Sequence, residues 1–93
     1  MNDDVCRATL EIVNKLGLHA RAAVLLVQAS SRFDATVTVS KEGQSVDGRS
    51  IMGVMMLAAE QGSRIDVETS GPEARAALDA IAELVANRFN EAE

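Results

Sequence analysis

Apolar and polar residues alternate along three short stretches of this chain, which is the pattern of β-strands with one buried face. In the first stretch the apolar positions are Cys6, Ala8, Leu10 and Ile12. The other two stretches are residues 35–40 and 64–68. After residue 40, Lys41-Glu42-Gly43 predicts a hairpin turn into a short strand over residues 44–47.

Three further segments have the spacing of amphipathic helices, at about residues 19–31, 50–58 and 72–88. Ser50 is a good N-cap for the second, and Ser70-Gly71-Pro72-Glu73 is a strong start signal for the third. The apolar residues of the third helix form one stripe, which we expect to be buried: Ala74, Ala77, Leu78, Ile81, Val85 and Phe89.

The resulting order is β-α-β-β-α-β-α, which predicts the α+β class. One-sided strands with three helices favour an open-faced two-layer sandwich, in which a four-stranded antiparallel sheet carries three helices on one face. No linker, low-complexity segment or internal repeat interrupts the pattern, so we expect a single domain over residues 1–93. Cys6 is on the inward face of its strand and is interpreted as a small core residue.

Composition narrows the classes of function. The chain has 93 residues, is 47% hydrophobic and carries a net charge of −5, with two Phe and neither Tyr nor Trp. The acidic charge and the scarcity of aromatic side chains argue against nucleic-acid binding. One Cys and one His argue against a disulfide and against most metal sites. An acidic N-terminus and short apolar runs predict a cytoplasmic protein without membrane insertion.

The charge is unevenly distributed. Residues 1–65 hold seven acids and seven bases, whereas the last 28 residues hold seven acids and two arginines, which accounts for the −5. No acid lies between Ile12 and Phe33, a stretch in which Lys15, Arg21 and Arg32 surround the single His19. Chance clustering could also produce such a gap, so the pattern indicates only where an anion could bind.

His19 lies where a loop enters the first helix, and this position suits phosphoryl chemistry. The first helical turn offers the unpaired backbone N–H groups of Ala20, Arg21 and Ala22 to an anion. Gly17 gives the preceding loop conformational freedom, and Arg21 can place a guanidinium beside a group held by His19. The residues therefore predict an imidazole that accepts and releases a phosphoryl group.

Two simpler roles for His19 remain open at this stage. A histidine at a helix N-terminus can act only as a cap. A general acid/base role would require a partner acid, which the acid-free stretch does not contain, although one could come from elsewhere in the fold.

Two segments together carry a family resemblance: residues 17–23, Gly-Leu-His-Ala-Arg-Ala-Ala, and residues 50–57, Ser-Ile-Met-Gly-Val-Met-Met-Leu. The chain resembles HPr, the histidine-containing phosphocarrier of the bacterial phosphoenolpyruvate-dependent phosphotransferase system, from about residue 5 to 89. The resemblance implies the fold predicted above, phosphorylation of His19 on Nδ1, Arg21 as its neighbouring arginine, and no cofactor. Sugar-type members usually have Pro where this chain has Ala22, so the sugar and nitrogen branches both remain open.

The second helix is too short to bury more than one stripe. We expect its core-facing residues to be Val54, Leu57 and Ala58, with Met56 completing the core. Ile51, Met52 and Met55 are then exposed and form an adaptable docking patch, with Arg49 at its rim. By resemblance, the first and second helices form the surface that meets the family's partners.

Ser50 has two interpretations. As an N-cap it satisfies helix N–H groups and needs no further role. By resemblance it matches the serine that an HPr kinase phosphorylates in many bacteria, where a phosphate would add about two negative charges beside the docking patch.

The sequence therefore predicts a monomeric phosphocarrier that is a co-substrate rather than an enzyme. By resemblance, enzyme I is its phosphoryl donor and enzyme IIA-type proteins are its acceptors. One alternative is a regulatory binding module of the nitrogen-branch type, whose phosphorylation state signals to partners. The other is a small hydrolase that uses His19 and Arg21.

Overall fold

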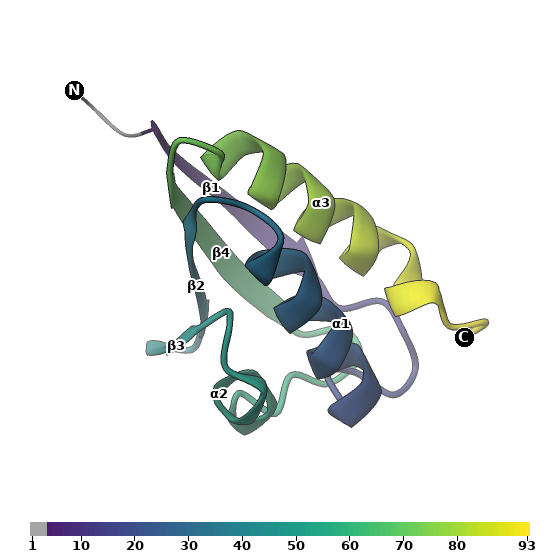
Figure 1. Ribbon diagram of the computed structural model, residues 1–93. Coiled ribbons are helices and arrows are strands. Elements are labelled where there is room, and N and C mark those ends of the chain that lie inside the picture. Colours follow the sequence, from purple (N-terminus) through teal and green to yellow (C-terminus); the bar gives the residue numbers. More distant parts are fainter. Residues whose placement is uncertain (1–3) are drawn as a thin grey trace.

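A computed structural model describes residues 4–93 and confirms the predicted order and class (Figure 1). The elements are β1 (Asp4–Glu11), α1 (Ala20–Ser31), β2 (Thr36–Lys41), β3 (Gln44–Asp47), α2 (Ile51–Met56), β4 (Arg64–Gly71) and α3 (Ala74–Ala86). A single tight turn, η1 (Arg88–Asn90), follows α3. Residues 1–3, part of the acidic N-terminus noted above, lie outside the described residues.

All neighbouring strands are antiparallel, in the order β1-β4-β2-β3, and the helices cover one face of the sheet (Figure 1). The central position of β4 places Val67 between Ala8 of β1 and Val39 of β2. The predicted hairpin is present, and its two turn residues, Glu42 and Gly43, have φ values of 51° and 83°. Positive φ at both positions is what a type I′ hairpin turn requires.

The core lies between the sheet and the helices. Its largest fully buried side chains come from strands, helices and loops alike: Phe89, Ile12, Leu26, Ile65 and Ile81. Each contributes roughly 1.5–3 kcal/mol by leaving water. Cys6 belongs to this core and is a free thiol, as predicted.

The opposite face of the sheet is polar, because it has no helix to cover it. Its cross-strand contacts include Arg7 with Glu68 at 2.7 Å and the hydroxyl of Thr9 with Asp66 at 2.7 Å. This polar face is consistent with the strict alternation of the strands. None of the helices among residues 4–93 is long and apolar enough to cross a membrane.

The second helix departs from prediction at two positions. Met56 was expected in the core but is 66% exposed, and Ala58 was expected to be buried but is exposed. The helix has only six residues and therefore one short inward stripe. Val54 and the C-cap residue Leu57 fill that stripe, so Met56 remains in solvent. Ala58 has a φ of 50°, which ends the helical path and turns Ala59 into the core instead.

The end of α3 also differs from prediction, and this difference shapes the site. The helix was expected to run to about Arg88, but it ends at Ala86. The next three residues of the turn, Arg88, Phe89 and Asn90, have φ values of 58°, 52° and 62°. This left-handed turn reverses the chain while Phe89 is buried, as its place on the apolar stripe predicted.

Candidate functional site

His19 occupies the N-cap position of α1, but its side chain makes no capping hydrogen bond. The first backbone bond of the helix is donated by the N–H of Ala23 to the carbonyl oxygen of His19, at 2.8 Å. The three preceding N–H groups, of Ala20, Arg21 and Ala22, therefore lie before the first helical bond. The cap interpretation is thus wrong for the imidazole, which is free to act elsewhere.

The loop before His19 passes very close to the segment that follows α2. Gly17 has a φ of 68°, and a Cβ atom built on it would lie 2.4 Å from the carbonyl oxygen of Ala59. The N–H of Leu18 donates to that same oxygen at 2.9 Å. A side chain at position 17 would therefore displace the loop that carries His19.

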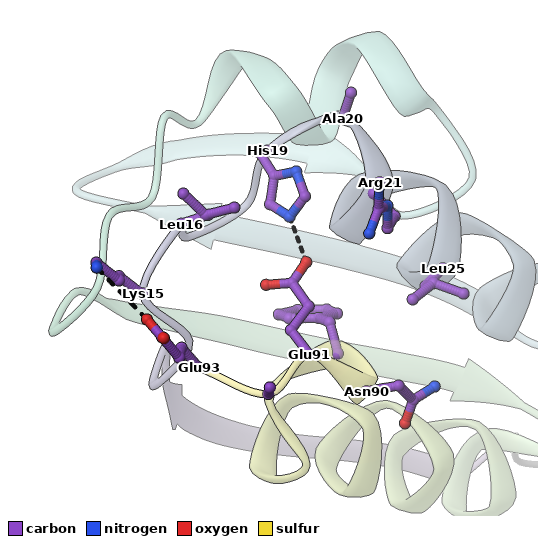
Figure 2. A pocket seen from close by; sticks show the side chains of 11 residues that line it. Lys15, Leu16, His19, Ala20, Arg21, Leu25, Asn90, Glu91 and Glu93 are labelled. Atoms are coloured by element: carbon purple, nitrogen blue, oxygen red, sulfur yellow. Dashed lines mark hydrogen bonds and ion pairs between the residues drawn. The ribbon is translucent and has the colours of Figure 1, made fainter.

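The imidazole of His19 contacts the carboxylate of Glu91, which the left-handed turn brings back from the end of α3 (Figure 2). The contact joins Nε2 of His19 to Oε2 of Glu91, and the two side chains are 28% and 13% exposed. The other carboxylate oxygen accepts a 3.0 Å hydrogen bond from Nδ2 of Asn14. Asn14 also donates to the carbonyl oxygen of Gly17 at 2.8 Å, so its amide links both sides of the site.

Glu91 is ionised in this environment. Burial acts to raise the pKa of Glu91, but hydrogen bonds from His19 and Asn14 and the electrostatic influence of the His19 and Arg21 side chains together lower it more strongly. The pKa of Glu91 therefore lies below its ordinary value of 4.5. Because an ionised carboxylate has no proton to donate, Nε2 of His19 must be the donor in this contact.

A pocket of about 1070 Å³ opens over this pair, between the start of α1 and the end of the chain (Figure 2). Its ionisable lining residues are Lys15, His19, Arg21, Glu91 and Glu93. Lys15 is paired with Glu93 at 3.4 Å, whereas the guanidinium of Arg21 has no ion-pair partner among residues 4–93. The pocket therefore brings the imidazole of His19 together with a guanidinium that has no ion-pair partner among the described residues.

The second helix lies at the same end of the molecule as the N-terminal end of α1 (Figure 1). Ile51, Met52 and Met55 are exposed by 43%, 76% and 41%, as predicted. The side chain of Leu16, next to the pocket, is 67% exposed. We call this apolar surface, made of Leu16, Ile51, Met52, Met55 and Met56, the methionine patch.

Ser50 caps α2 as predicted, because its Oγ accepts a 3.0 Å hydrogen bond from the N–H of Gly53. Arg49, expected at the rim of the patch, directs a guanidinium nitrogen to the carbonyl oxygen of Ala35. Its backbone N–H donates to the carboxylate of Asp47 at 2.9 Å. These contacts join the start of α2 to the sheet and give Arg49 a structural role.

Comparison with known proteins identifies the family. A family model described as the PTS HPr component phosphorylation site matches residues 6–87. The chain belongs to the HPr family. Phosphocarrier protein HPr from Cupriavidus necator is 54% identical over 82 residues, which cover 88% of this chain and 92% of that one.

Solved HPr structures have the same fold. A crystal structure of HPr-C-His from Thermoanaerobacter tengcongensis superposes with a TM-score of 0.91 at 38% identity, covering 95% of this chain and 99% of that chain. HPr from Bacillus anthracis gives a TM-score of 0.84 at 41% identity, covering 87% of this chain and 96% of that chain. The chain is therefore an HPr-type phosphocarrier protein by family, in agreement with the two sequence segments that first indicated it.

The sequence did not identify Asn14 or Glu91 as parts of the site. Glu91 lies 72 residues from His19, and nothing near either residue indicates the pairing. Nor does the site include a metal centre, because residues 4–93 contain no cluster of three or more His, Cys, Asp or Glu side chains suited to hold one.

Proposed function

We propose that this HPr-family protein relays a phosphoryl group from phosphorylated enzyme I to enzyme II components, carrying it transiently on His19. The observation that carries the proposal is the position of the imidazole. It stands at the N-terminal end of α1, faces an open pocket, and shares that pocket with the guanidinium of Arg21, which has no ion-pair partner among residues 4–93. A nucleophile, a cation and helix N–H groups in one place suit a dianionic phosphoryl group.

In this proposal Nδ1 of His19 is the atom that reacts. Nε2 is engaged by Glu91, and Nδ1 has no hydrogen-bond partner among residues 4–93. The N–H groups of Ala20, Arg21 and Ala22, with the guanidinium of Arg21, would hold the phosphoryl oxygens. The protein would be restored to its starting form by each transfer, so it acts as a co-substrate.

The methionine patch is the proposed docking surface for enzyme I and for enzyme IIA-type acceptors. Its flexible thioether side chains can adapt to several partners. Leu16, one member of the patch, lines the pocket of His19, so a partner bound on the patch would bring its phosphorylated or accepting residue toward the imidazole. A partner surface of this kind would need apolar groups at its centre and a polar rim.

Incubation with enzyme I, phosphoenolpyruvate and magnesium tests the relay. We expect one equivalent of acid-labile phosphate on the wild-type protein and none on His19→Ala. Subsequent addition of an enzyme IIA should discharge the label. Arg21→Gln should fold normally and accept the phosphoryl group more slowly, whereas Arg75→Gln, which alters an exposed helical ion pair at 3.7 Å, should match the wild type.

The same experiment distinguishes the alternatives. Phosphorylation without transfer to any enzyme II would support a regulatory module. Steady release of inorganic phosphate by the protein alone would support a hydrolase, for which the His19 and Glu91 pair would supply the base and its orienting acid. Absence of phosphate on the wild-type protein would overturn the relay altogether.

A further inference from the structure

We propose that Glu91, held by Asn14, is a positioning residue that keeps the His19 proton on Nε2 and so presents the Nδ1 lone pair for phosphoryl transfer. This inference rests on the proposed function and deepens it, since it assigns the residues that choose the reacting nitrogen. A neutral imidazole has one donor and one acceptor nitrogen, and a carboxylate beside one of them determines which is which.

The carboxylate of Glu91 is held at both of its oxygens. Oε2 faces Nε2 of His19, and Oε1 accepts from Asn14. Asn14 is fully buried, and its Nδ2 donates to both Glu91 and the carbonyl of Gly17. Two acceptors around this nitrogen define the orientation of the amide, so the carboxylate cannot rotate without breaking a buried contact.

The backbone before Glu91 provides a second, independent observation. Three consecutive residues that are not glycine, Arg88, Phe89 and Asn90, are left-handed. Left-handed helical backbone costs roughly 1–2 kcal/mol per residue for most side chains. The buried ring of Phe89 holds this turn in place, and the turn directs Glu91 back toward α1. Strained backbone of this kind persists only where the surrounding structure holds it in place.

The chemistry of transfer explains how the contact would help. The Nδ1 lone pair attacks phosphorus, the N–P bond of the donor's phosphohistidine breaks, and its electron pair stays on the donor nitrogen. The proton remains on Nε2 of His19, so the ring becomes cationic as the new Nδ1–P bond forms. The carboxylate of Glu91 stabilises that positive charge, as the aspartate of a serine-protease triad stabilises an imidazolium. The retained positive charge also makes the ring a better leaving group in the second transfer.

The negative charge of Glu91 does not block the phosphoryl group. Figure 2 shows the carboxylate below the imidazole, at the Nε2 end of the ring, while the other ring nitrogen points away from it. Arg21 lines the same pocket and offsets negative charge there. The carboxylate can therefore act on the ring without competing for the phosphoryl site.

Two measurements on Glu91→Ala, Glu91→Gln and Glu93→Gln test the inference. Nitrogen-15 NMR of unphosphorylated protein reports which ring nitrogen of His19 carries the proton, without any partner protein. The rate of phosphorylation by phosphorylated enzyme I reports the effect on transfer. Glu93→Gln is the matched control, because it removes the same charge from a nearby residue that pairs with Lys15 instead.

We expect the wild type and Glu93→Gln to be protonated on Nε2. Glu91→Ala should show a mixture of the two neutral forms and transfer roughly tenfold to a hundredfold more slowly, by analogy with the loss seen when the hydrogen-bond partner of a metal-binding histidine is removed. Glu91→Gln retains an acceptor oxygen without the charge, so its rate should lie between the two. It also remains testable if the alanine variant does not fold.

An unchanged tautomer in Glu91→Ala, or transfer as fast as in the wild type, would overturn the inference. Faster transfer would show that the contact restrains His19 instead of preparing it. These outcomes presuppose a wild-type protein that accepts phosphate on His19. If the wild type accepts none, the proposed function has failed, and the NMR measurement still decides the role of Glu91 in protonation.

Discussion

Gly17 and Ala59 approach so closely that a Cβ atom on Gly17 would stand 2.4 Å from the carbonyl oxygen of Ala59. We predict that Gly17→Ala lowers the free energy of unfolding by about 2 kcal/mol or more, because it combines a backbone clash with an unfavourable positive φ. Chemical denaturation measures this loss. Gly62→Ala is the control, since Gly62 has a φ of 90° but no atom within 4 Å of its Cβ position. Its loss should be about 1 kcal/mol, and equal losses would rule out the clash.

Asn90 provides a test of the left-handed turn. Its φ is 62°, a conformation that asparagine tolerates and glycine adopts freely. Asn90→Ala should therefore lose about 1 kcal/mol of stability, while Asn90→Gly should change it by only a few tenths. Thermal unfolding measures both. Asn87→Ala, at a residue with a φ of −88°, should be nearly neutral. A loss at Asn87 equal to that at Asn90 would contradict the role of backbone conformation.

The ionised state of Glu91 predicts a dependence of stability on pH. Because its folded pKa is depressed, the contribution is complete above the ordinary value of 4.5 and is lost as the pH falls below 4.5 through the folded pKa. The wild type should therefore lose its stability advantage over Glu91→Gln as the solution is acidified through that range. Denaturation at a series of pH values tests this. A difference between the two proteins that stays constant down to low pH would contradict the prediction.

Two variants of Ser50 should separate its capping of α2 from the effect of a negative charge at this position. Ser50→Ala removes the acceptor for the N–H of Gly53 and should cost about 1 kcal/mol, with enzyme I binding retained. Ser50→Asp keeps a capping oxygen but adds a negative charge beside the methionine patch, and should weaken enzyme I binding. Calorimetry on both variants measures the affinities. Equal affinity for enzyme I would remove the basis for regulation by an HPr kinase at this serine.

The methionine patch predicts a loss of binding without a loss of stability. Met52 and Met56 are 76% and 66% exposed, so replacing both with Gln should change stability by less than about 0.5 kcal/mol per site. Enzyme I affinity should fall by roughly fivefold or more if the patch is the docking surface. Val5→Gln is the control, because Val5 is also exposed but lies in β1, away from α2 (Figure 1). A fall in affinity as large for the control would place the docking surface elsewhere.

The sequence predicted the elements and most of their buried faces, because periodicity is a local property that each strand or helix carries by itself. The strand order β1-β4-β2-β3 was not predicted, since pairing depends on residues far apart in the chain. Met56 shows the limit of the local argument. It is as apolar as its neighbours, but Val54 and Leu57 had already filled the inward stripe of a six-residue helix.

For the candidate site, the sequence likewise indicated some residues and missed others. His19, Arg21 and Ser50 were singled out as site candidates because they belong to two recognisable segments. Glu91 was missed because it lies beyond the helix predicted to end at about Arg88, and the left-handed turn that redirects the chain has no strong signal apart from Asn90. Asn14 was not singled out by the sequence, although its buried amide joins the loop before His19 to Glu91.

The 72 residues between His19 and Glu91 have a consequence for the order in which the site forms during folding. Closing so long a loop carries an entropic penalty that local contacts cannot offset, so this pair forms only after the sheet and α3 have brought the two segments together. Helix α1 can form with its histidine at the N-cap well before that point. A folding intermediate with α1 in place would thus contain the whole segment of residues 17–23. It would still lack the contact with Glu91 that determines which ring nitrogen of His19 carries the proton.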